Sequence, residues 1–351
     1  MTGEVGMTMK AVRLFGKDDL RVESVPVPEI GEHEILVKTG AAMICGTDIR
    51  MHKNGNPTLP ITLGHEFAGT VAAVGRMVKG YAVGMRVAVA PNYGCAVCDF
   101  CTLGQTQNCL ELKALGIHVD GGFAEYVRIP AEAVAQGNVC PIGEKIPFAH
   151  AALAEPLSCV YNSFERARLQ PGESVVVIGA GPIGLLHAKL YRAAGAGKII
   201  INDINEERLA ACKKEDPFFD TVSADDAVGR IMALTHGRGA DIIVTAASAP
   251  ATQQLAFQLP AVNGRVIFFG GLPKDREIVP LNTNVIHYRQ ITVTGTSRQS
   301  LGQYRRCLAL IGQGVIEVSN IVTGGYSLDD AAAAFDDAAK GVGLKTGFVF
   351  G

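Results

Sequence analysis

Four closely spaced cysteines, Cys95, Cys98, Cys101 and Cys109, form the most chemically specific pattern in the sequence. Two short intervals followed by a longer one allow four thiolates to converge on a single tetrahedral zinc ion. Because four protein ligands fill the coordination sphere, a zinc ion held in this way can brace a loop but cannot bind a substrate. The spacing therefore predicts a structural zinc site.

A second group, Cys45, His65 and Glu66, could form a metal site of a different kind. Thiolate, imidazole and carboxylate are all ligands that zinc accepts. Three protein ligands leave a fourth position open for water or a substrate, which a catalytic zinc requires. A single Cys, His or Glu is usually structural. The prediction of a metal site therefore depends on the presence of the four-cysteine group and of the glycine-rich motif in the same chain.

A glycine-rich string at residues 179–184, Gly-Ala-Gly-Pro-Ile-Gly, directly follows the apolar run 175–178. Its three glycines permit a tight turn, a close approach of backbone to a pyrophosphate, and close packing of a helix on a strand. Asp203 ends the next apolar run, where a carboxylate can accept hydrogen bonds from the adenosine ribose and repel a 2'-phosphate. NAD is therefore expected rather than NADP, although Arg208 could reach either the adenine or a phosphate. The expected cofactor-binding residues are Gly179, Gly181, Pro182, Ile183, Gly184, Asp203, Arg208 and Thr296.

The residue pattern differs between the first part of the chain and the middle, which indicates that two kinds of domain position these residues. Residues 1–150 are rich in Gly, Pro and short β-like runs, which indicates an irregular β-rich unit. From about Gly172, apolar strands alternate with helical segments, which indicates a parallel sheet covered on both faces. We expect an α/β protein in which a doubly wound domain, residues 157–289, is inserted into a β-rich domain formed by residues 1–156 and 290–351.

Composition narrows the class of protein. A length of 351 residues favours two domains, and a formal net charge of -2 gives no reason to expect nucleic acid or an anionic membrane as a partner. No signal-like segment begins the sequence, and no apolar run reaches the length of a membrane-spanning helix. The odd count of 9 cysteines does not favour a disulfide framework, so a reducing, cytoplasmic location is expected.

Taken together, the motifs resemble those of the zinc-dependent medium-chain dehydrogenases, especially the polyol (sorbitol or L-iditol) and threonine dehydrogenase branches. The resemblance covers essentially the whole chain. It implies a GroES-like catalytic domain, a Rossmann domain, two zinc ions per chain, and reversible transfer of hydride from a secondary alcohol to NAD. The matching segments are residues 45–48, 64–69, 95–109, 155–158, 179–184, 284–288 and 294–296.

The resemblance also implies roles for individual residues near the catalytic zinc. Cys45 and His65 would bind the metal in every state, whereas Glu66 would bind it or leave it. Glu155 would lie at the zinc or hold its water, and Thr47 would take the proton of the alcohol. Because one thiolate and two carboxylates would overcompensate the charge of Zn²⁺, one carboxylate stays outside the coordination sphere at each stage, and the sequence does not decide which one.

Two positions depart from the family pattern. Many relatives carry a His where this chain has Arg50, and Met51 stands where the sorbitol branch often has an aromatic residue. Arginine cannot shuttle a proton, so the sequence does not decide which group follows Thr47 in the proton relay. His52 is one candidate to replace the missing histidine. Arg50 could bind an anionic substrate or be a solvated surface residue, whereas Arg298 matches a substrate-contact position of the polyol branch. We expect a small polyhydroxylated substrate, with sorbitol itself doubtful.

Three hypotheses about activity stay open at this point. The first is an NAD-dependent polyol dehydrogenase, and the second is a threonine-type, other amino-alcohol or sugar-phosphate dehydrogenase. The third is an inactive zinc protein of the same fold, against which the retention of all the expected site residues argues. The resemblance further implies a dimer or tetramer, built by pairing edge strands of the nucleotide domains close to the strand at residues 265–269.

Overall fold

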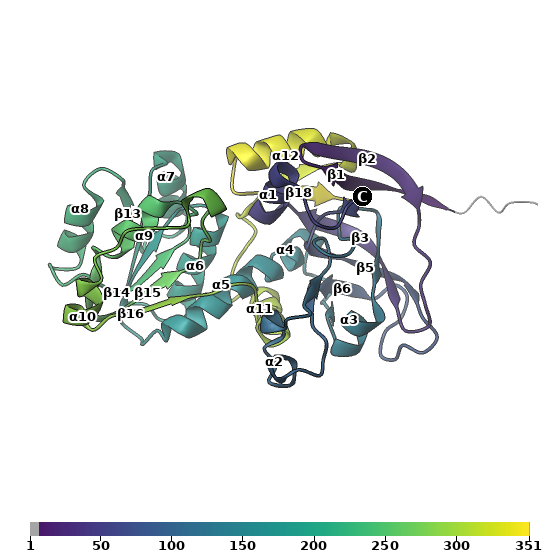
Figure 1. Cartoon of the computed structure of the whole chain (residues 1–351), viewed down its shortest axis with the longest axis horizontal. Coiled ribbons are helices and arrows are strands. Elements are labelled where there is room, and N and C mark those ends of the chain that lie inside the picture. Colours follow the sequence, from purple (N-terminus) through teal and green to yellow (C-terminus); the bar gives the residue numbers. More distant parts are fainter. Residues whose placement is uncertain (1–6, 351) are drawn as a thin grey trace, which may run out of the picture. The chain divides into compact units, whose positions relative to one another are not determined.

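The computed structural model describes residues 7–350, and the chain divides into two compact units (Figure 1). Unit 1 comprises Met1–Pro156 and Gln299–Gly351, and unit 2 comprises Leu157–Arg298. The return to unit 1 lies later than the expected residue 290, because strand β16 (Thr292–Gly295) still pairs with β15 (Pro260–Phe268) in the sheet of unit 2. Among the described residues, no helix is both long and apolar enough to cross a membrane.

Unit 1 is β-rich, and strands from both ends of the chain form its seven-stranded sheet. The strands follow the order β10 (Val139–Pro141), β6 (Arg86–Val89), β5 (Glu66–Val74), β3 (Ile35–Met43), β18 (Lys345–Val349) and β17 (Val322–Tyr326), and β9 (Tyr126–Ile129) also pairs with β3. Gly69 lets β5 approach β3 closely, because a Cβ atom there would lie 2.0 Å from the Lys38 carbonyl oxygen. Strand β18, from the end of the chain, pairs with β3 and so joins the sheet that carries Glu66 of the predicted metal site.

Two smaller sheets and several helices complete unit 1. The small sheets are β2 (Asp19–Pro26), β1 (Thr8–Gly16) and β4 (Ile61–Thr62), and the pair β7 (Asn92–Tyr93) and β8 (Lys113–Ala114). The helices are α1 (Gly46–Asn54), α2 (Asp99–Thr102), α3 (Ala131–Gln136), α4 (Phe148–Ala152), α11 (Leu301–Gly312) and α12 (Ala331–Lys340). Phe335 of α12 packs with Phe123 and Leu14 in the core of this unit, which buries the apolar face of the helix.

Unit 2 contains a six-stranded sheet in which every neighbouring pair is parallel. The order is β13 (Phe219–Ser223), β12 (Lys198–Asp203), β11 (Ser174–Ile178), β14 (Ala240–Thr245), β15 and β16. The helices of this unit are the greater part of α5 (Ala154–Ala167), then α6 (Pro182–Ala193), α7 (Glu206–Glu215), α8 (Ala227–Leu234), α9 (Pro250–Ala256) and α10 (Asn284–Arg289). The strand order reverses beside β11, and ligands bind at such a switch point in doubly wound sheets. The expected α/β class, with a β-rich domain and a Rossmann-type parallel sheet, is confirmed.

A buried histidine lies in the core of unit 2. His187 of α6 has an exposed fraction of 0%, and neither ring nitrogen has a hydrogen-bond partner. The ring stacks on Tyr191 and meets Phe269 edge-on, with ring centroids 6.1 Å and 5.0 Å away. Burial lowers the pKa of His187 to about 3, so the folded protein holds this side chain in its neutral form.

We therefore expect His187→Phe to make the protein less sensitive to acid. The depressed pKa means that the unfolded state binds a proton near pH 6.5 while the folded state does not. The resulting stability is fully present above that pH and is lost as the pH falls, by about 2 kcal/mol at pH 5. Urea unfolding of both proteins at pH 7 and pH 5 measures the difference. An equal loss of stability in the variant would show that His187 is not the titrating group.

Candidate functional site

The four cysteines of the predicted structural zinc site lie together in unit 1. One sulfur atom from each of Cys95, Cys98, Cys101 and Cys109 falls within 4.8 Å of the others, and all four thiols are free of disulfides. The Cys98 and Cys109 sulfurs are 3.8 Å apart. Zn–S bonds of about 2.3 Å in a tetrahedron place sulfurs about 3.8 Å apart, so this cluster has the size that zinc requires.

The backbone around the cluster favours thiolates. The amide nitrogen of Cys95 lies 3.4 Å from Cys109 Sγ, and that of Cys98 lies 3.4 Å from Cys95 Sγ. Hydrogen bonds from the backbone of Val97 and Cys98 lower the pKa of the Cys95 thiol to about 7. Burial, with the neighbouring thiols, raises the pKa of Cys101 to about 12. Four thiolates this close repel one another, and a bound cation would remove that repulsion.

Two zinc ions per chain are expected, and the two sites should empty separately. Cys98→Ser and Cys45→Ser should each leave one zinc ion, because each variant removes a ligand from a different group. Cys212→Ser should keep both ions, since Cys212 lies in unit 2 and belongs to neither group. Elemental analysis of the purified proteins gives these counts. A single zinc ion in the unmodified protein would contradict the assignment of the second site.

The second metal group is assembled at the start of a helix and of a strand. Cys45 is the N-cap of α1, whereas His65 directly precedes β5 and Glu66 is the first residue of that strand. One ligand atom from each lies within 4.8 Å of the other two. His65 and Glu66 are buried, and Glu66 Oε2 has no hydrogen-bond partner. A buried, unpartnered carboxylate oxygen beside a thiol and an imidazole fits a metal ion.

Asp48, which belongs to the matching segment 45–48 but was assigned no role from it, orients His65. Its Oδ2 accepts a hydrogen bond of 2.8 Å from the Cys45 backbone, and its Oδ1 lies 3.5 Å from His65 Nδ1. Burial alone would lower the pKa of His65, but Asp48 and Cys45 outweigh it and raise that pKa well above its ordinary value. A carboxylate at Nδ1 leaves Nε2 available as a metal ligand. Its place three residues after Cys45 is the signal that could have identified it.

Lys345 is the second residue that the sequence did not indicate. Its Nζ lies 2.7 Å from Glu66 Oε1, and both side chains are buried. The pair joins residues 279 positions apart in the chain. The ammonium group neutralises one oxygen of Glu66 and leaves the other, Oε2, to face the ligand group.

Glu155 lies beside this group without being one of its three members. Its exposed fraction is 6%, and Oε1 accepts a hydrogen bond of 3.0 Å from Gln299 Nε2. Burial raises the pKa of Glu155 to about 7, although the charges of His65 and Lys345 oppose the rise. The sequence pattern indicates the neighbouring Arg298 as a substrate contact but does not indicate Gln299 as the partner of Glu155.

Three residues of α1 that follow Thr47, namely Arg50, Met51 and His52, form no proton relay from the Thr47 hydroxyl. Arg50 Nη2 donates a 2.8 Å hydrogen bond to Thr47 Oγ1. Met51 Sδ accepts a hydrogen bond from the Asn56 amide. His52 does not join this arrangement, because its ring packs edge-on against Phe335 at a centroid distance of 5.6 Å.

In unit 2, the glycine string connects β11 to α6. Gly179 has a φ of +119°, which few other residues tolerate, and a Cβ atom on Gly184 would lie 1.8 Å from the Gly179 carbonyl oxygen. Gly181 is the N-cap of α6, and Pro182 is its first residue, followed by Ile183. This is the geometry that brings backbone N–H groups close to a pyrophosphate.

Asp203 is the last residue of β12 and also braces this loop. Its Oδ2 accepts a hydrogen bond of 2.5 Å from the Ala180 backbone, and its Oδ1 accepts one of 2.8 Å from the Asn205 backbone. Arg208 reaches the loop as well, because a Cβ atom on Gly181 would lie 3.9 Å from Arg208 Nη1. A carboxylate that already accepts two hydrogen bonds keeps further lone pairs for a ribose.

A cavity of about 390 Å³ lies in unit 2, and its lining includes Asn202 and Ile204, the chain neighbours of Asp203, together with Asp226. Its walls include Ile178, Ile204, Ala224 and Thr252, none of which the sequence had indicated. An apolar cavity at the carboxyl ends of parallel strands can hold a flat aromatic ring such as adenine.

Two further residues of unit 2 complete the expected set. Thr296 Oγ1 is buried and without a hydrogen-bond partner. The side chain of Arg298 is exposed, and its backbone carbonyl accepts a 2.9 Å hydrogen bond from Asn162 Nδ2. The buried Thr296 hydroxyl, which has no partner, is therefore available to a ligand.

Comparison with known proteins gives matches over both parts of the chain. Residues 31–139 match the alcohol dehydrogenase GroES-like domain, and residues 182–313 match the zinc-binding dehydrogenase domain. Sorbitol dehydrogenase of Bacillus subtilis (strain 168) is 34% identical over 347 residues, which cover 97% of this chain and 96% of that protein. L-threonine 3-dehydrogenase of Bacillus velezensis is 33% identical over 350 residues, 97% of each chain.

Similarity to solved structures is equally extensive. The chain superimposes with a TM-score of 0.90 on a candidate zinc-binding dehydrogenase from Sinorhizobium meliloti 1021, crystallised with NADP. The two sequences are 32% identical, and the alignment covers 98% of this chain and 100% of the other.

Proposed function

Because the chain belongs to the zinc-binding alcohol dehydrogenase family, we propose that it oxidises a secondary alcohol of a small polyhydroxylated substrate with NAD, reversibly giving the ketone. The observation that carries this proposal is the buried group formed by Cys45, His65 and Glu66, with Glu155 beside it. This donor set suits a catalytic rather than a structural metal, because three ligands leave a position open.

The residues around the group support a division of tasks. A zinc ion bound there would act as a Lewis acid and polarise the substrate hydroxyl. Thr47 Oγ1, which Arg50 holds by a hydrogen bond, keeps a lone pair that can accept a hydrogen bond from that hydroxyl and orient it. Gln299 orients Glu155, whose carboxylate can serve the metal or its water.

The proposed cofactor is NAD, held by the glycine loop of unit 2. Asp203 supports this choice, because a 2'-phosphate near its carboxylate would be repelled. The Sinorhizobium structure was crystallised with NADP, so the preference is a matter for direct comparison of the two nucleotides. Thr296 Oγ1 is a further candidate contact to the nucleotide.

A second candidate function has an observation of its own. Arg50 is exposed and lies against Thr47, the proposed hydrogen-bond partner of the substrate hydroxyl. A guanidinium there could bind an anionic group, so a polyol phosphate or a hydroxy acid is the alternative substrate class. A threonine-type activity is the other alternative, since that relative is nearly as similar as sorbitol dehydrogenase.

A substrate panel tests these proposals. Polyols, polyol phosphates, hydroxy acids, threonine and simple alcohols are each offered to the zinc-loaded protein with NAD or NADP, and the absorbance of the reduced nicotinamide is followed. Arg50→His should lower activity on anionic substrates selectively if Arg50 binds them. Glu155→Ala should lower turnover strongly if the carboxylate serves the metal. No oxidation of any substrate by fully loaded protein would refute the dehydrogenase proposal.

We also propose that the chain forms a homodimer or a tetramer. Strand β16 pairs with β15 on one side and is the last strand of the sheet order given for unit 2. An open edge of this kind can pair with the same edge of a second copy. Light scattering gives the molar mass that tests this, and a mass of one chain would contradict it.

A further inference from the structure

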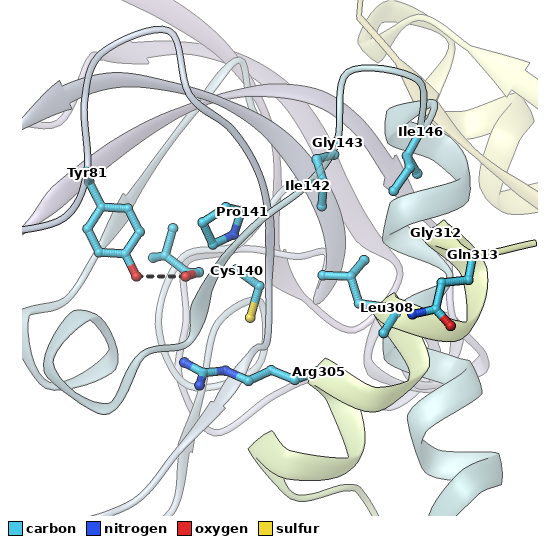
Figure 2. A pocket seen from close by; sticks show the side chains of 12 residues that line it. Tyr81, Cys140, Pro141, Ile142, Gly143, Ile146, Arg305, Leu308, Gly312 and Gln313 are labelled. Carbon is cyan, nitrogen blue, oxygen red and sulfur yellow. Dashed lines mark hydrogen bonds between the residues drawn. The ribbon is translucent and has the colours of Figure 1, made fainter.

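A cavity of about 510 Å³ lies within unit 1, between β10 with the loop that follows it and helix α11 (Figure 2). Tyr81 stands on one side of it, and Leu308 and Ile146 stand on the other. Cys140 and Arg305 lie between these two sides, and the Cys140 sulfur points toward the Arg305 side chain. None of the residues assigned above to the metal or nucleotide sites lines this cavity.

Arg305 gives the cavity a positive charge that its walls do not balance. No Asp or Glu is among the described residues that line it. The guanidinium is held in place at the backbone of Gly137, to whose carbonyl oxygen Nη2 donates a hydrogen bond of 2.6 Å. Arg305 is an exposed residue at the rim of the cavity, and its guanidinium also hydrogen-bonds the Cys140 side chain. Of the five N–H donors of the planar guanidinium, several remain for a ligand.

The rest of the cavity is largely apolar. Ile142, Ile146 and Leu308 supply hydrocarbon walls, and Pro141 lies between Cys140 and Ile142. The volume is that of sites for small organic ligands, about 300 to 1,000 Å³. A single guanidinium at the rim of apolar walls suits a ligand that carries one negative charge at the end of a hydrocarbon chain.

We propose that this cavity binds a small amphipathic monocarboxylate, with its carboxylate on Arg305 and its hydrocarbon chain along Leu308 and Ile146. Charge complementarity and the separation of charged and apolar walls identify this class of ligand. The ligand would lie against α11, whose capping residue Ser300 follows Gln299, the partner of Glu155.

Helix α11 and the residues before it connect the cavity with the metal site along the chain. Arg305 and Leu308 of α11 line the cavity, and Ser300, which caps this helix, follows Gln299, whose Nε2 donates a hydrogen bond to Glu155 Oε1. The proposal about binding does not depend on the proposed dehydrogenase activity, and it can be tested without it.

The chain contains no Trp, which allows a single tryptophan to report on the cavity. Gln313 lines the cavity and is exposed, so Gln313→Trp places an indole at its rim. Adding octanoate to the full-length, zinc-loaded variant should change the tryptophan emission saturably. In this background, Arg305→Met should weaken octanoate binding at least about tenfold, because it removes a charged hydrogen-bonding partner.

Matched controls separate this proposal from weaker alternatives. Arg306→Met changes the neighbouring arginine, which does not line the cavity, and should leave octanoate binding within about twofold. Octanol, which lacks the charge, and acetate, which lacks the chain, should each bind at least about tenfold more weakly than octanoate. If Arg305→Met does not fold by circular dichroism, Arg305→Lys, which keeps the charge but loses the planar fork, should still weaken binding measurably.

Three results would overturn the proposal. Unchanged octanoate binding in the Arg305 variant is the first, and equal binding of octanol and octanoate is the second. The third is an emission change that follows protein concentration and molar mass in light scattering, because a second copy of the chain would then cover the cavity. None of these readouts uses enzymatic activity, so failure here and failure of the proposed dehydrogenase reaction are distinguishable.

Discussion

Replacing Lys345 with methionine is expected to lower the free energy of unfolding of the metal-free protein by about 3 to 5 kcal/mol, the cost of leaving a buried charge without its partner. Lys345 Nζ lies 2.7 Å from Glu66 Oε1, with side-chain exposed fractions of 7% and 0%. Methionine fills a similar volume but cannot compensate the carboxylate. The loss should be smaller with zinc bound, because the metal would then compensate Glu66. Urea unfolding with and without zinc measures both values.

Two variants show whether the pair itself is responsible. Adding Glu66→Gln to Lys345→Met should recover much of the lost stability, because no buried charge is then left unpaired. Lys340→Met breaks an exposed ion pair with Asp336, with side-chain exposed fractions of 65% and 57%, and should cost far less than the loss of the buried pair, because water screens the exposed charges. If Lys345→Met costs no more than Lys340→Met, the buried pair does not compensate Glu66.

The second large effect is expected at Asp203. Asp203→Asn should lower kcat/KM with NAD by about 100-fold, because a charged acceptor of ribose hydrogen bonds becomes a neutral one. The same change should improve NADP relative to NAD, since the repulsion of the 2'-phosphate disappears. Steady-state kinetics with both nucleotides measure the ratio. Asparagine has nearly the same shape and can still accept a hydrogen bond at the glycine loop, where Asp203 binds the Ala180 backbone.

This prediction has a clear alternative. If Asp203 acts mainly by bracing the loop through Ala180 and Asn205, both nucleotides should weaken by the same factor. An unchanged ratio of the two kcat/KM values would therefore assign Asp203 to loop structure. Thermal unfolding of the variant, which should change little if Asp203 discriminates between nucleotides, gives the independent check.

The parts of the site that could be predicted from the sequence are those whose residues are close together in the chain. The four cysteines and the glycine string reveal themselves by spacing, because each forms within one loop. The alternation of apolar strands and helices likewise predicts the parallel sheet of unit 2, since each element is encoded locally. Cys45 and His65 were recognised through their motifs, although α1 and β5 hold them on separate elements.

Partners that meet only through tertiary structure could not be predicted. Lys345 reaches Glu66 because β18 pairs with β3 next to β5, and nothing local in the sequence specifies that register. Gln299 reaches Glu155 across 144 positions for a similar reason. The second boundary, expected at residue 290, could not be located from the sequence, because β16 is too short to show that it joins the sheet of unit 2. His52, a substitute suggested by position alone, packs against Phe335 instead.

The pairing of Glu66 with Lys345 has a consequence for the newly made protein. The ribosome produces Glu66 long before Lys345, 279 residues later, and synthesises all of unit 2 in the interval. The four cysteines, by contrast, leave the ribosome almost together and can capture zinc early. The four cysteines can therefore meet before Lys345 exists, whereas the group formed by Cys45, His65 and Glu66 gains its full electrostatic balance only when β18 has been inserted into the sheet.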